Sequence, residues 1–349
     1  MKYITGNIIL APLAWLYQCI TGLRNRLFDM NILKSVEFDF PVICIGNLSA
    51  GGTGKTPFTA FIAGFLLPEY RVAVLSRGYK RKTKGFQLAD DKSDALTIGD
   101  EPFELKRKFA GLCVAVDEKR VRGIEKLQEI RSDIQVVLLD DAFQHRAVNA
   151  GLNILLTDYN RLFTNDYQLP YGMLRESRKG YKRADIIVVT KCPDTISENE
   201  ISDIRNKIKP LEGQEIYFAG LMYSDIYQMF NTDVRLTSDE LQDREVILMT
   251  GIVSPEQAMN YLIGNGAKVE LMQFPDHHFF TEGDYRKLMN KADDKIIIIT
   301  EKDAARIVND KNFPAELKEK IYVLPVGITI LQNREQHLIT KIKNYVTAN

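Results

Sequence analysis

The sequence predicts an α/β protein built around a parallel sheet, with a second, smaller α/β unit after it and an amphipathic helix before it. Three observations support this fold class. Strands rich in Val, Ile and Leu alternate with helical segments from residue 40 onward, a glycine-rich loop joins the first strand to a helix, and the alternation lapses at 216 and resumes at 244. Such strands are typical of a parallel sheet covered on both faces. At ~150 residues per domain, the 349 residues are enough for about two cores.

The composition excludes several classes of protein. The chain has 46 basic and 46 acidic side chains, so its bulk charge gives no support for nucleic-acid binding, and we expect no nucleic-acid partner. Its four cysteines, Cys19, Cys44, Cys113 and Cys192, are far apart and form no Cys-x-x-Cys pair. That spacing argues against a disulfide framework or a zinc knuckle and fits free thiols in a reducing cytosol. No apolar run reaches the ~18 residues expected of a transmembrane helix.

Residues 1–34 form the first predicted unit, the amphipathic helix. Apolar side chains recur at helical spacing in one stripe, namely Ile9, Leu13, Leu16, Ile20, Leu23 and Leu27. Pro12 suits the first turn of this helix, and Lys2, Arg24 and Arg26 flank the stripe. The small-residue cleavage pattern of a signal peptide is missing. From these residues alone, the helix either packs on its own domain or lies in a membrane interface, where the basic flank would favour anionic lipid.

Residues 35–215 form the main predicted α/β unit. Strands are expected at 40–46, 71–76, 112–116, 136–140, 153–157 and 185–190, with a helix over 55–67. Residues 216–243 lose the alternation and are interpreted as a connector or hinge. Residues 244–349 form the predicted smaller unit, with strands at 246–250, 269–274, 295–300 and 321–324 and a final helix at the C-terminus.

A glycine-rich phosphate-binding loop is the strongest chemical signal. It consists of Ser49, Ala50, Gly51, Gly52, Thr53, Gly54, Lys55 and Thr56, between a predicted strand and a predicted helix. Glycines let successive backbone N–H groups face phosphates, and the helix N-terminus adds partial positive charge. Lys55 is expected to reach the β- and γ-phosphates of ATP, and the Thr56 hydroxyl to ligate Mg²⁺. Ser49 stands where the strict pattern has glycine, so this is a variant loop, and its context predicts the P-loop NTPase type of sheet rather than a plain turn.

Two adjacent acidic residues, Asp140 and Asp141, end the apolar strand at 136–140. In phosphate-loop folds, a strand that delivers a carboxylate beside the loop holds the Mg²⁺ shell. An acidic pair at a strand end also occurs as an ordinary solvated turn. We predict that the pair belongs to the metal site, and the sequence does not decide which of the two lies nearer the metal.

Histidines provide a third signal, because the chain has only four. His145 follows the acidic pair, and His277 and His278 follow a strand of the second unit. Strand ends are where open α/β sheets place ligands, and a neutral imidazole accepts a proton from a hydroxyl near pH 7. His337 is expected to be structural or at the surface.

Asp100 and several arginines have more than one interpretation. Asp100 precedes a predicted helix, so these residues alone favour an N-cap over a catalytic role. Arginines follow several strands and are candidates for binding anionic groups, although each alone is more often a solvated charge; they are Arg77, Arg120, Arg146 and Arg175.

Several short blocks, taken together and in order, resemble the tetraacyldisaccharide 4'-kinases, the lipid A 4'-kinases of Gram-negative bacteria. The blocks lie at residues 46–48 leading into 51–57, then 76–79, 99–102, 140–145, 169–170 with 172–176, 274–278 and 300–303. They span nearly the whole chain, and their joint occurrence is far more specific than the phosphate loop alone. The chain departs from the family pattern at Ala142, where the family usually has glycine, which puts the local backbone geometry near the phosphates in doubt.

The resemblance implies transfer of the ATP γ-phosphate to the 4'-hydroxyl of a tetraacylated glucosamine disaccharide 1-phosphate. It also implies a peripheral enzyme at the cytoplasmic face of the inner membrane, with residues 1–34 as the anchor and no obligate protein partner. Asp100 and His277 are implied as a catalytic pair, in which His277 takes the hydroxyl proton and Asp100 orients it. Further residues are expected to bind substrate or stabilise charge, with Glu176 holding Arg175; they are Arg77, Gln144, His145, Arg175 and Glu176. Since the base lies on the second unit and ATP on the first, a hinge closure is expected.

Two rival functions use the same phosphate loop. One is a switching or partitioning NTPase at the membrane, and the other is a membrane-bound scaffold that uses ATP for assembly. The spacing of Lys191 and Asp194 is wrong for the guanine clamp of GTPases. Neither rival needs a general base on the second unit, so His277 favours the kinase.

Overall fold

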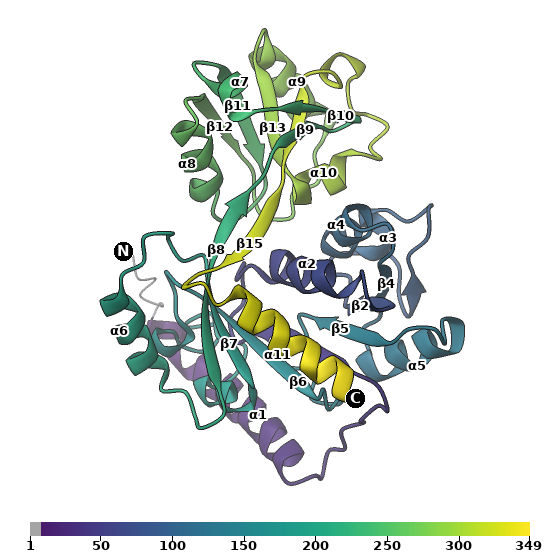
Figure 1. Cartoon of the computed structure of the whole chain (residues 1–349), viewed down its shortest axis with the longest axis vertical. Helices are drawn as coiled ribbons and strands as arrows, with labels where there is room; N and C mark the ends of the chain where they lie inside the picture. The colour runs from purple at the N-terminus through teal and green to yellow at the C-terminus, as the bar shows by residue number, and fades with distance from the viewer. Residues whose placement is uncertain (1–7) are drawn as a thin grey trace.

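The computed structural model describes residues 8–349 as two lobes joined by a pair of adjacent strands (Figure 1). The large lobe contains a nine-stranded sheet of order β15-β8-β7-β6-β1-β5-β2-β4-β3, and the small lobe a six-stranded sheet of order β10-β9-β14-β13-β11-β12. This confirms the predicted α/β class with a main, largely parallel sheet and a smaller second unit. Residues 1–7, including Lys2 of the predicted basic flank, lie outside the described residues.

Six of the nine strands described in the large lobe fall close to where the apolar runs predict them, and the strands at 87–88, 215–223 and 326–330 were not predicted. The nine described strands are β1 Val42–Asn47, β2 Val72–Ser76, β3 Gln87–Leu88, β4 Cys113–Val116, β5 Val136–Asp140, β6 Leu152–Asp158, β7 Ile186–Thr190, β8 Glu215–Tyr223 and β15 Val326–Ile330. Strand β1 pairs in parallel with β5 on one side and with β6 on the other. The phosphate loop leaves β1 and the acidic pair leaves β5, so the two motifs come out at the same edge of the sheet.

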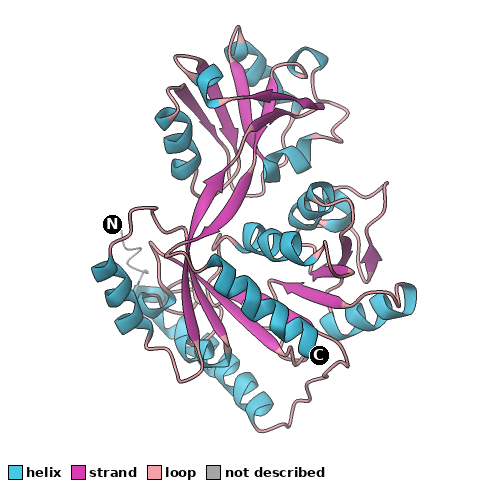
Figure 2. Ribbon diagram, in the orientation of Figure 1, coloured by secondary structure: helices cyan, strands magenta, loops and turns pink. Residues whose placement is uncertain are grey.

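Helices cover both faces of this sheet (Figure 2). They are α2 Lys55–Leu66, α3 Ala95–Ile98, α4 Asp100–Lys108, α5 Arg120–Ile130, α6 Glu198–Ile208 and α11 Glu335–Ala348. Side chains of α2 and α11 share one buried cluster with the sheet, and those of α5 and α6 share the cluster on the other face. Short 3-10 turns lie at η1 Ile8–Leu10, η2 Phe163–Asn165 and η3 Arg178–Arg183. Because both faces are covered, the strands are apolar on both sides, which explains their near-continuous Val/Ile/Leu runs.

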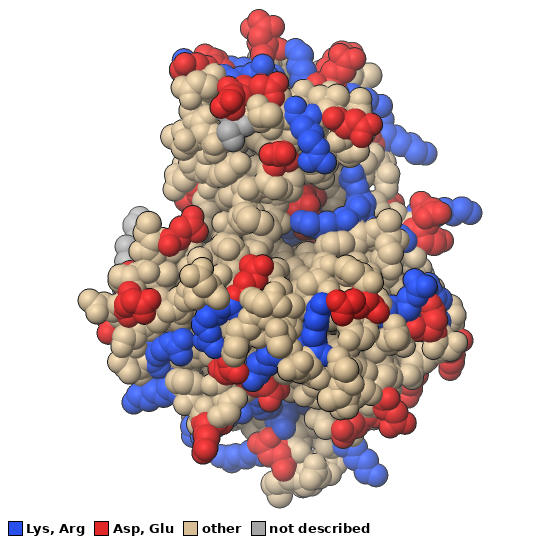
Figure 3. Space-filling view, viewed as in Figure 1, with Lys and Arg blue, Asp and Glu red and all other residues tan. Residues whose placement is uncertain are grey.

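The small lobe has the same layered plan. Its strands are β9 Ile226–Gln228, β10 Asn231–Leu236, β11 Glu245–Thr250, β12 Lys268–Gln273, β13 Ile296–Thr300 and β14 Ile321–Leu324. Its helices are α7 Ser238–Leu241, α8 Glu256–Gly264, α9 Glu282–Ala292 and α10 Glu301–Ile307, with a 3-10 turn η4 Ala315–Leu317. Charges of both signs are interspersed over both lobes on the face drawn in Figure 3, which agrees with the zero net charge.

The link between the lobes differs from a connector without regular structure. The segment 216–243 contains most of β8, all of β9 and β10, and α7. Strand β8 pairs antiparallel with β15, and the two run side by side between the lobes (Figure 1). The last helix, grouped with the smaller unit in the sequence, packs its apolar stripe of Leu338, Ile342 and Val346 into the core of the large lobe. The apolar period of such a helix predicts a buried face but not which sheet buries it.

The N-terminal helix α1, Ala11–Asp29, lies on the large lobe with its polar side inward. Tyr17 donates a hydrogen bond to the carbonyl of Arg175 over 2.8 Å, and Asn25 donates to Glu176 over 2.8 Å. The stripe residues Leu16 and Ile20 remain 51% and 60% exposed. Packing on its own domain therefore does not bury the stripe. Among residues 8–349, no helix combines the length and apolarity needed to cross a bilayer.

Candidate active site

The phosphate loop is held open by contacts from three neighbouring segments. Asn47 of β1 donates to the Thr53 hydroxyl over 2.8 Å, and Thr190 at the end of β7 donates to the Thr53 carbonyl over 2.8 Å. Lys191 also donates to a loop carbonyl. Gly51 and Gly54 have positive φ angles of 112° and 76°, which favour glycine at both positions. The Ala50 N–H donates to the Met173 carbonyl over 2.6 Å, whereas the backbone hydrogen bonds found within residues 8–349 do not use the N–H groups of residues 51–54.

Lys55 and Thr56 open helix α2 at the end of this loop. The Nζ of Lys55 lies 3.6 Å from Oδ1 of Asp141, and Thr56 is nearly buried at the helix N-terminus. Three residues on, Thr59 donates from its hydroxyl to Oδ1 of Asp140 over 3.1 Å. The predicted loop residues and the acidic pair are therefore together in space.

The two acids of the pair have different surroundings. Asp140 is buried, and burial together with the negative charges of Glu101 and Asp141 raises the pKa of Asp140 to about 7. Burial also acts to raise the pKa of Asp141, but the charges of Lys55 and Arg175 outweigh it and hold that pKa below its ordinary value. Arg175 donates to both oxygens of Asp141 at 2.8 and 2.9 Å. Asp140 thus lacks sufficient positive charge around it, whereas Asp141 is already paired.

The chemistry of this corner fits Mg²⁺. Thr56 and Asp140 offer a hydroxyl and a carboxylate, and Glu101 adds a carboxylate close enough to raise the pKa of Asp140. Within residues 8–349, no group of three or more His, Cys, Asp or Glu side chains is arranged as a metal cage. Mg²⁺ is commonly bound through one or two carboxylates plus the phosphates of a substrate, so such a cage is not required.

Asp100 and His277 meet across the two lobes. His277 follows β12, Asp100 opens α4, and Nδ1 of His277 lies 2.7 Å from Oδ2 of Asp100. The N-cap of α4 is Gly99, with a φ of 95°, and Asp100 is the first residue of the helix itself, so the N-cap interpretation of Asp100 is wrong. Burial acts to raise the pKa of Asp100, but the hydrogen bond from His277 and the charges of Arg306 and Lys302 hold it well below its ordinary value.

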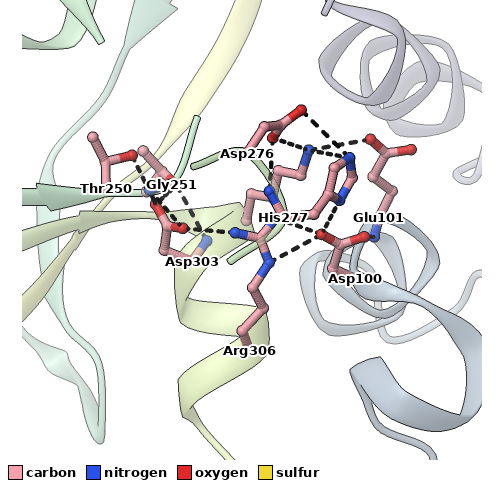
Figure 4. A network of polar contacts seen from close by, with 10 residues as sticks. Asp100, Glu101, Thr250, Gly251, Asp276, His277, Asp303 and Arg306 are labelled. Carbon is pink, nitrogen blue, oxygen red and sulfur yellow. Dashed lines mark hydrogen bonds and ion pairs between the residues drawn. The ribbon is translucent and has the colours of Figure 1, made fainter. Parts of the chain in front are cut away.

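The second nitrogen of His277 faces the space between the lobes. A carboxylate accepts the hydrogen of Nδ1, so Nε2 is the ring nitrogen left to accept a proton. Nε2 lies 3.3 Å from Nζ of Lys302 and 3.5 Å from Oδ2 of Asp276 (Figure 4). Tyr79 packs its ring edge against the imidazole at 5.0 Å. The imidazole is therefore held at Nδ1 by Asp100, while Nε2 contacts Lys302 at the wall of a cavity.

Two cavities meet beside this histidine. The loop cavity, of about 410 Å³, is lined by residues 50–57, by the linking strands β8 and β15, and by His277 and Lys302. The α1 cavity, of about 350 Å³, is lined by α1 together with Arg77, Gln144 and His145. Both cavities have four residues in their walls in common, which are Tyr79, Glu101, Asp141 and Arg175.

The remaining predicted residues divide between the α1 cavity and its supports. Arg77 is exposed at the cavity, and burial lowers the pKa of His145 to about 4, with Arg120 contributing in the same direction. Glu176 is buried behind the cavity wall, where it accepts hydrogen bonds from Gln144 over 2.9 Å and Arg183 over 2.8 Å. The expectation that Glu176 holds Arg175 is wrong, because Asp141 binds the guanidinium of Arg175 instead.

The other histidines lie away from the cavities. His278 bonds to Asp284 over 2.9 Å and stacks on Phe274, and His337 contacts the Tyr217 hydroxyl over 2.8 Å on α11. This agrees with the structural role expected for His337. Four charged or aromatic residues around Asp100 and the cavities were not among the predicted site residues: Tyr79, Glu101, Lys302 and Arg306. Tyr79, Glu101 and Lys302 lie inside the sequence blocks that resemble the family, but nothing in the residue pattern marked these three as functional.

Comparison with known proteins gives one consistent family. The sequence profile described as LpxK, Tetraacyldisaccharide-1-P 4'-kinase, matches residues 6–346. The tetraacyldisaccharide 4'-kinase of Flavobacterium johnsoniae is 45% identical over 341 residues, covering 98% of this chain and 97% of the relative. That of Bacteroides fragilis strain YCH46 is 43% identical over 350 residues, covering 97% and 93%. The crystal structure of "apo" form LpxK from Aquifex aeolicus in complex with ATP superposes with a TM-score of 0.74 at 30% identity, covering 97% of this chain and 98% of that one.

Proposed function

This chain belongs to the tetraacyldisaccharide-1-phosphate 4'-kinase family, and from that membership we propose how its residues carry out the reaction. The protein is an ATP-dependent kinase that phosphorylates the 4'-hydroxyl of a tetraacylated glucosamine disaccharide 1-phosphate in lipid A biosynthesis. A switching or partitioning NTPase is not favoured. The observation that carries the proposal is the junction where the loop cavity and the α1 cavity have Tyr79, Glu101, Asp141 and Arg175 in common, with His277 at its edge.

The loop cavity binds ATP. Loop N–H groups and Lys55 hold the phosphates, while the apolar side chains of Leu221, Ile252 and Val326 offer a surface to the adenine ring of ATP. When bound, Mg²⁺ supplies positive charge to the phosphate oxygens, and Thr56 with Asp140 and Asp141 would hold it. The raised pKa of Asp140 supports this role, because a buried carboxylate without enough countercharge favours a cation.

The α1 cavity receives the sugar end of the acceptor. Arg77, Gln144 and His145 line it, together with Arg24 of α1. Arg77 and Arg24 provide positive charge for the anionic substrate, and the low pKa of His145 keeps that ring neutral near pH 7. A hydroxyl that extends from this cavity toward the junction is brought close to His277.

His277 removes the hydroxyl proton at Nε2. Asp100 holds Nδ1 and so fixes the ring orientation and the tautomer. Asp100 itself is a poor base, because its pKa is held well below the ordinary value. The transferred phosphoryl group spreads negative charge over its oxygens, and Lys55, Arg175 and Lys302 place positive charge around the junction.

The large lobe attaches to the cytoplasmic face of the bacterial inner membrane through α1. The exposed apolar stripe enters the interface, and Trp15, at 67% exposure, lies at its margin. On one flank of α1, a groove of about 650 Å³ is lined by basic residues that include Arg26, Lys179 and Lys182. Among residues 8–349, these three side chains have no ion-pair partner, so they suit anionic headgroups.

Transfer of labelled phosphate tests the proposed function. Purified protein with [γ-³²P]ATP and Mg²⁺ is expected to label the disaccharide 1-phosphate at its 4'-position and to release little free phosphate without this acceptor. Turnover of ATP at the same rate without the acceptor would favour a switching NTPase instead. The Lys55→Met variant should lose transfer by roughly 10²–10³-fold, the effect of removing one preorganised donor to developing charge.

A further inference from the structure

Arg306 of α10 joins two carboxylates that belong to different lobes. Its Nε donates to Oδ2 of Asp100 over 3.0 Å, its Nη2 donates to the same oxygen, and its Nη1 donates to Oδ1 of Asp303 over 3.0 Å. The side chain is 1% exposed and lies between the two acids in Figure 4. A guanidinium with this many charge-assisted bonds has one fixed orientation. Arg306 therefore presents a rigid docking point to Asp100.

Asp303 anchors this arginine in the small lobe. Its Oδ2 accepts hydrogen bonds from the hydroxyls of Thr250 at 2.8 Å and Thr300 at 2.7 Å, and its carboxylate accepts the Gly251 N–H at 3.1 Å. Thr250 ends β11 and Thr300 ends β13, so the donors come from the strands of the small sheet. Arg306 consequently moves as part of the small lobe.

Asp100 reaches this docking point from the large lobe. Its Oδ1 accepts the Glu101 N–H at 3.0 Å within α4, and its Oδ2 takes both Arg306 and Nδ1 of His277. Arg306 lines neither cavity, so it contacts neither the nucleotide nor the acceptor site directly. Of its two carboxylate partners only Asp100 bonds to His277, so Arg306 reaches the imidazole through Asp100.

We propose that Arg306 is a positioning residue for phosphoryl transfer: it fixes the Asp100 carboxylate, which in turn holds His277 with Nε2 facing the acceptor hydroxyl. This inference rests on the role proposed above for Asp100 and His277. The contact between α4 and α10 that joins the lobes also completes the base, because Asp100 meets Arg306 and His277 in the same arrangement. Closure of the lobes and assembly of the base are thus one event.

A neighbouring arginine provides a matched control. Arg107 lies on α4 and donates from Nη1 to the carbonyl of Ala304 over 3.4 Å, across the same contact between the lobes. It does not touch Asp100 or His277. A general loss of contact between the lobes would affect Arg107 and Arg306 variants alike, whereas positioning through Asp100 affects only Arg306.

The first experiment measures kcat and KM for transfer to the disaccharide. Arg306→Met should lower kcat on the order of 10²-fold, the cost of a misplaced reacting group, with the KM for ATP unchanged. Arg306→Lys keeps the charge but loses the fork, so it should recover part of this loss. Arg107→Met should keep a kcat near that of the unaltered enzyme. An unchanged kcat in Arg306→Met, or an equal loss in Arg107→Met, would overturn the inference.

The second experiment combines variants. In an Asp100→Asn background, Arg306→Met should add little further loss, because the two residues act as one unit. Full additivity would instead assign Arg306 a separate structural role. Thermal unfolding with and without ADP checks that each variant folds and binds nucleotide, and if Arg306→Met does not fold, Arg306→Lys and Asp303→Asn take its place with the same expected direction. His277→Ala in the same series separates the proposals, since full turnover in that variant removes the base assignment itself.

Discussion

The two lobes hold their functional groups in different ways. The large lobe presents a contiguous loop, residues 49–56, on one strand–helix junction, and leaves the buried Asp140 with its pKa raised to about 7. The small lobe presents single side chains, His277 and Arg306, whose partner Asp100 is 177 and 206 positions away in the chain. The nucleotide site of the large lobe is a local motif whose Asp140 lacks sufficient positive charge around it. The general base, by contrast, is formed by His277, Asp100 and Arg306, and Asp100 contacts the other two only where the two lobes meet. Binding can therefore begin on one lobe, but chemistry needs both.

The largest expected effect comes from removing the general base that the small lobe contributes. His277→Ala should lower kcat by roughly 10²–10⁴-fold, the usual contribution of a general base, and should leave the affinity for ATP almost unchanged. Steady-state transfer and nucleotide-binding fluorescence measure the two quantities. His337→Gln is the control, because that ring lies on α11 away from both cavities. Near-normal turnover in His277→Ala would remove the histidine from the mechanism.

The second prediction concerns the outer face of the large lobe. Replacing both Leu16 and Ile20 with Asp should weaken binding to vesicles of phosphatidylcholine and phosphatidylglycerol on the order of 10-fold per substitution. Both side chains are exposed, so the fold should tolerate the change. Gln336→Asp with Asn344→Asp adds the same two charges to α11 and should not release the protein. Sedimentation of the Leu16/Ile20 variant with vesicles as before would assign the attachment to another surface.

The third prediction concerns Asp140, the buried carboxyl group without sufficient positive charge around it. The pKa of Asp140 is raised by burial from an ordinary 3.8 to about 7, so the folded protein binds this proton more tightly than the unfolded chain. The resulting stabilisation is present below about pH 4 and is lost as the pH rises through about 7. The free energy of unfolding of Asp140→Asn, measured in urea without nucleotide, should therefore rise relative to that of the unaltered protein by roughly 2 kcal/mol as the pH goes from 5 to 8.

The Asp140→Asn variant also tests whether the large lobe binds Mg²⁺ through Asp140. If Asp140 helps hold Mg²⁺, then Mg²⁺ with ADP should stabilise the unaltered protein at pH 8 more than it stabilises Asp140→Asn. Phosphate transfer should fall in Asp140→Asn at every pH. Identical pH slopes in the two proteins would show that Asp140 gains its countercharge elsewhere.

The smallest expected effect concerns the basic groove. Lys179→Ala and Lys182→Ala should each reduce binding to anionic vesicles by about 5-fold, since a Lys near such a surface contributes about 1 kcal/mol. The loss should shrink at high salt and vanish on neutral vesicles. Lys287→Ala and Lys311→Ala, both exposed on the small lobe, serve as controls. Equal losses in the two pairs would mean that bulk charge rather than the groove is responsible.

The sequence predicts local features better than tertiary ones, for a physical reason. The phosphate loop, the strand that ends at Asp140 and the stripe of α1 are each encoded within a few turns or residues, so their pattern is visible without the fold. The placement of α11 on the large lobe cannot be predicted from the sequence, because an apolar stripe does not specify which sheet it packs against. The role of Asp100 came from resemblance to a family, since its own neighbours favoured a cap.

Arg306 and Glu176 illustrate the limit at the site itself. Arg306 lies in the last turn of α10, where a basic residue is ordinary. Its burial between two acids follows only from the packing of α4 against α10. Glu176 stands next to Arg175 in the chain, which favours a pair, but Asp141 binds the guanidinium of Arg175, and Glu176 accepts hydrogen bonds from Gln144 and Arg183 instead.

The pairing of β8 with β15 has a consequence for how this architecture can be rearranged. The chain departs from the nucleotide-binding sheet on one strand and comes back on its immediate neighbour, so everything from β9 to β14 is a single uninterrupted insertion. Such an insertion can be exchanged, shortened or transplanted as one piece while the sheet beneath it remains whole. The small lobe can therefore be exchanged between relatives as one unit, and a working hybrid needs two matched features: the β8–β15 ribbon and the contact at which Asp100 meets His277 and Arg306.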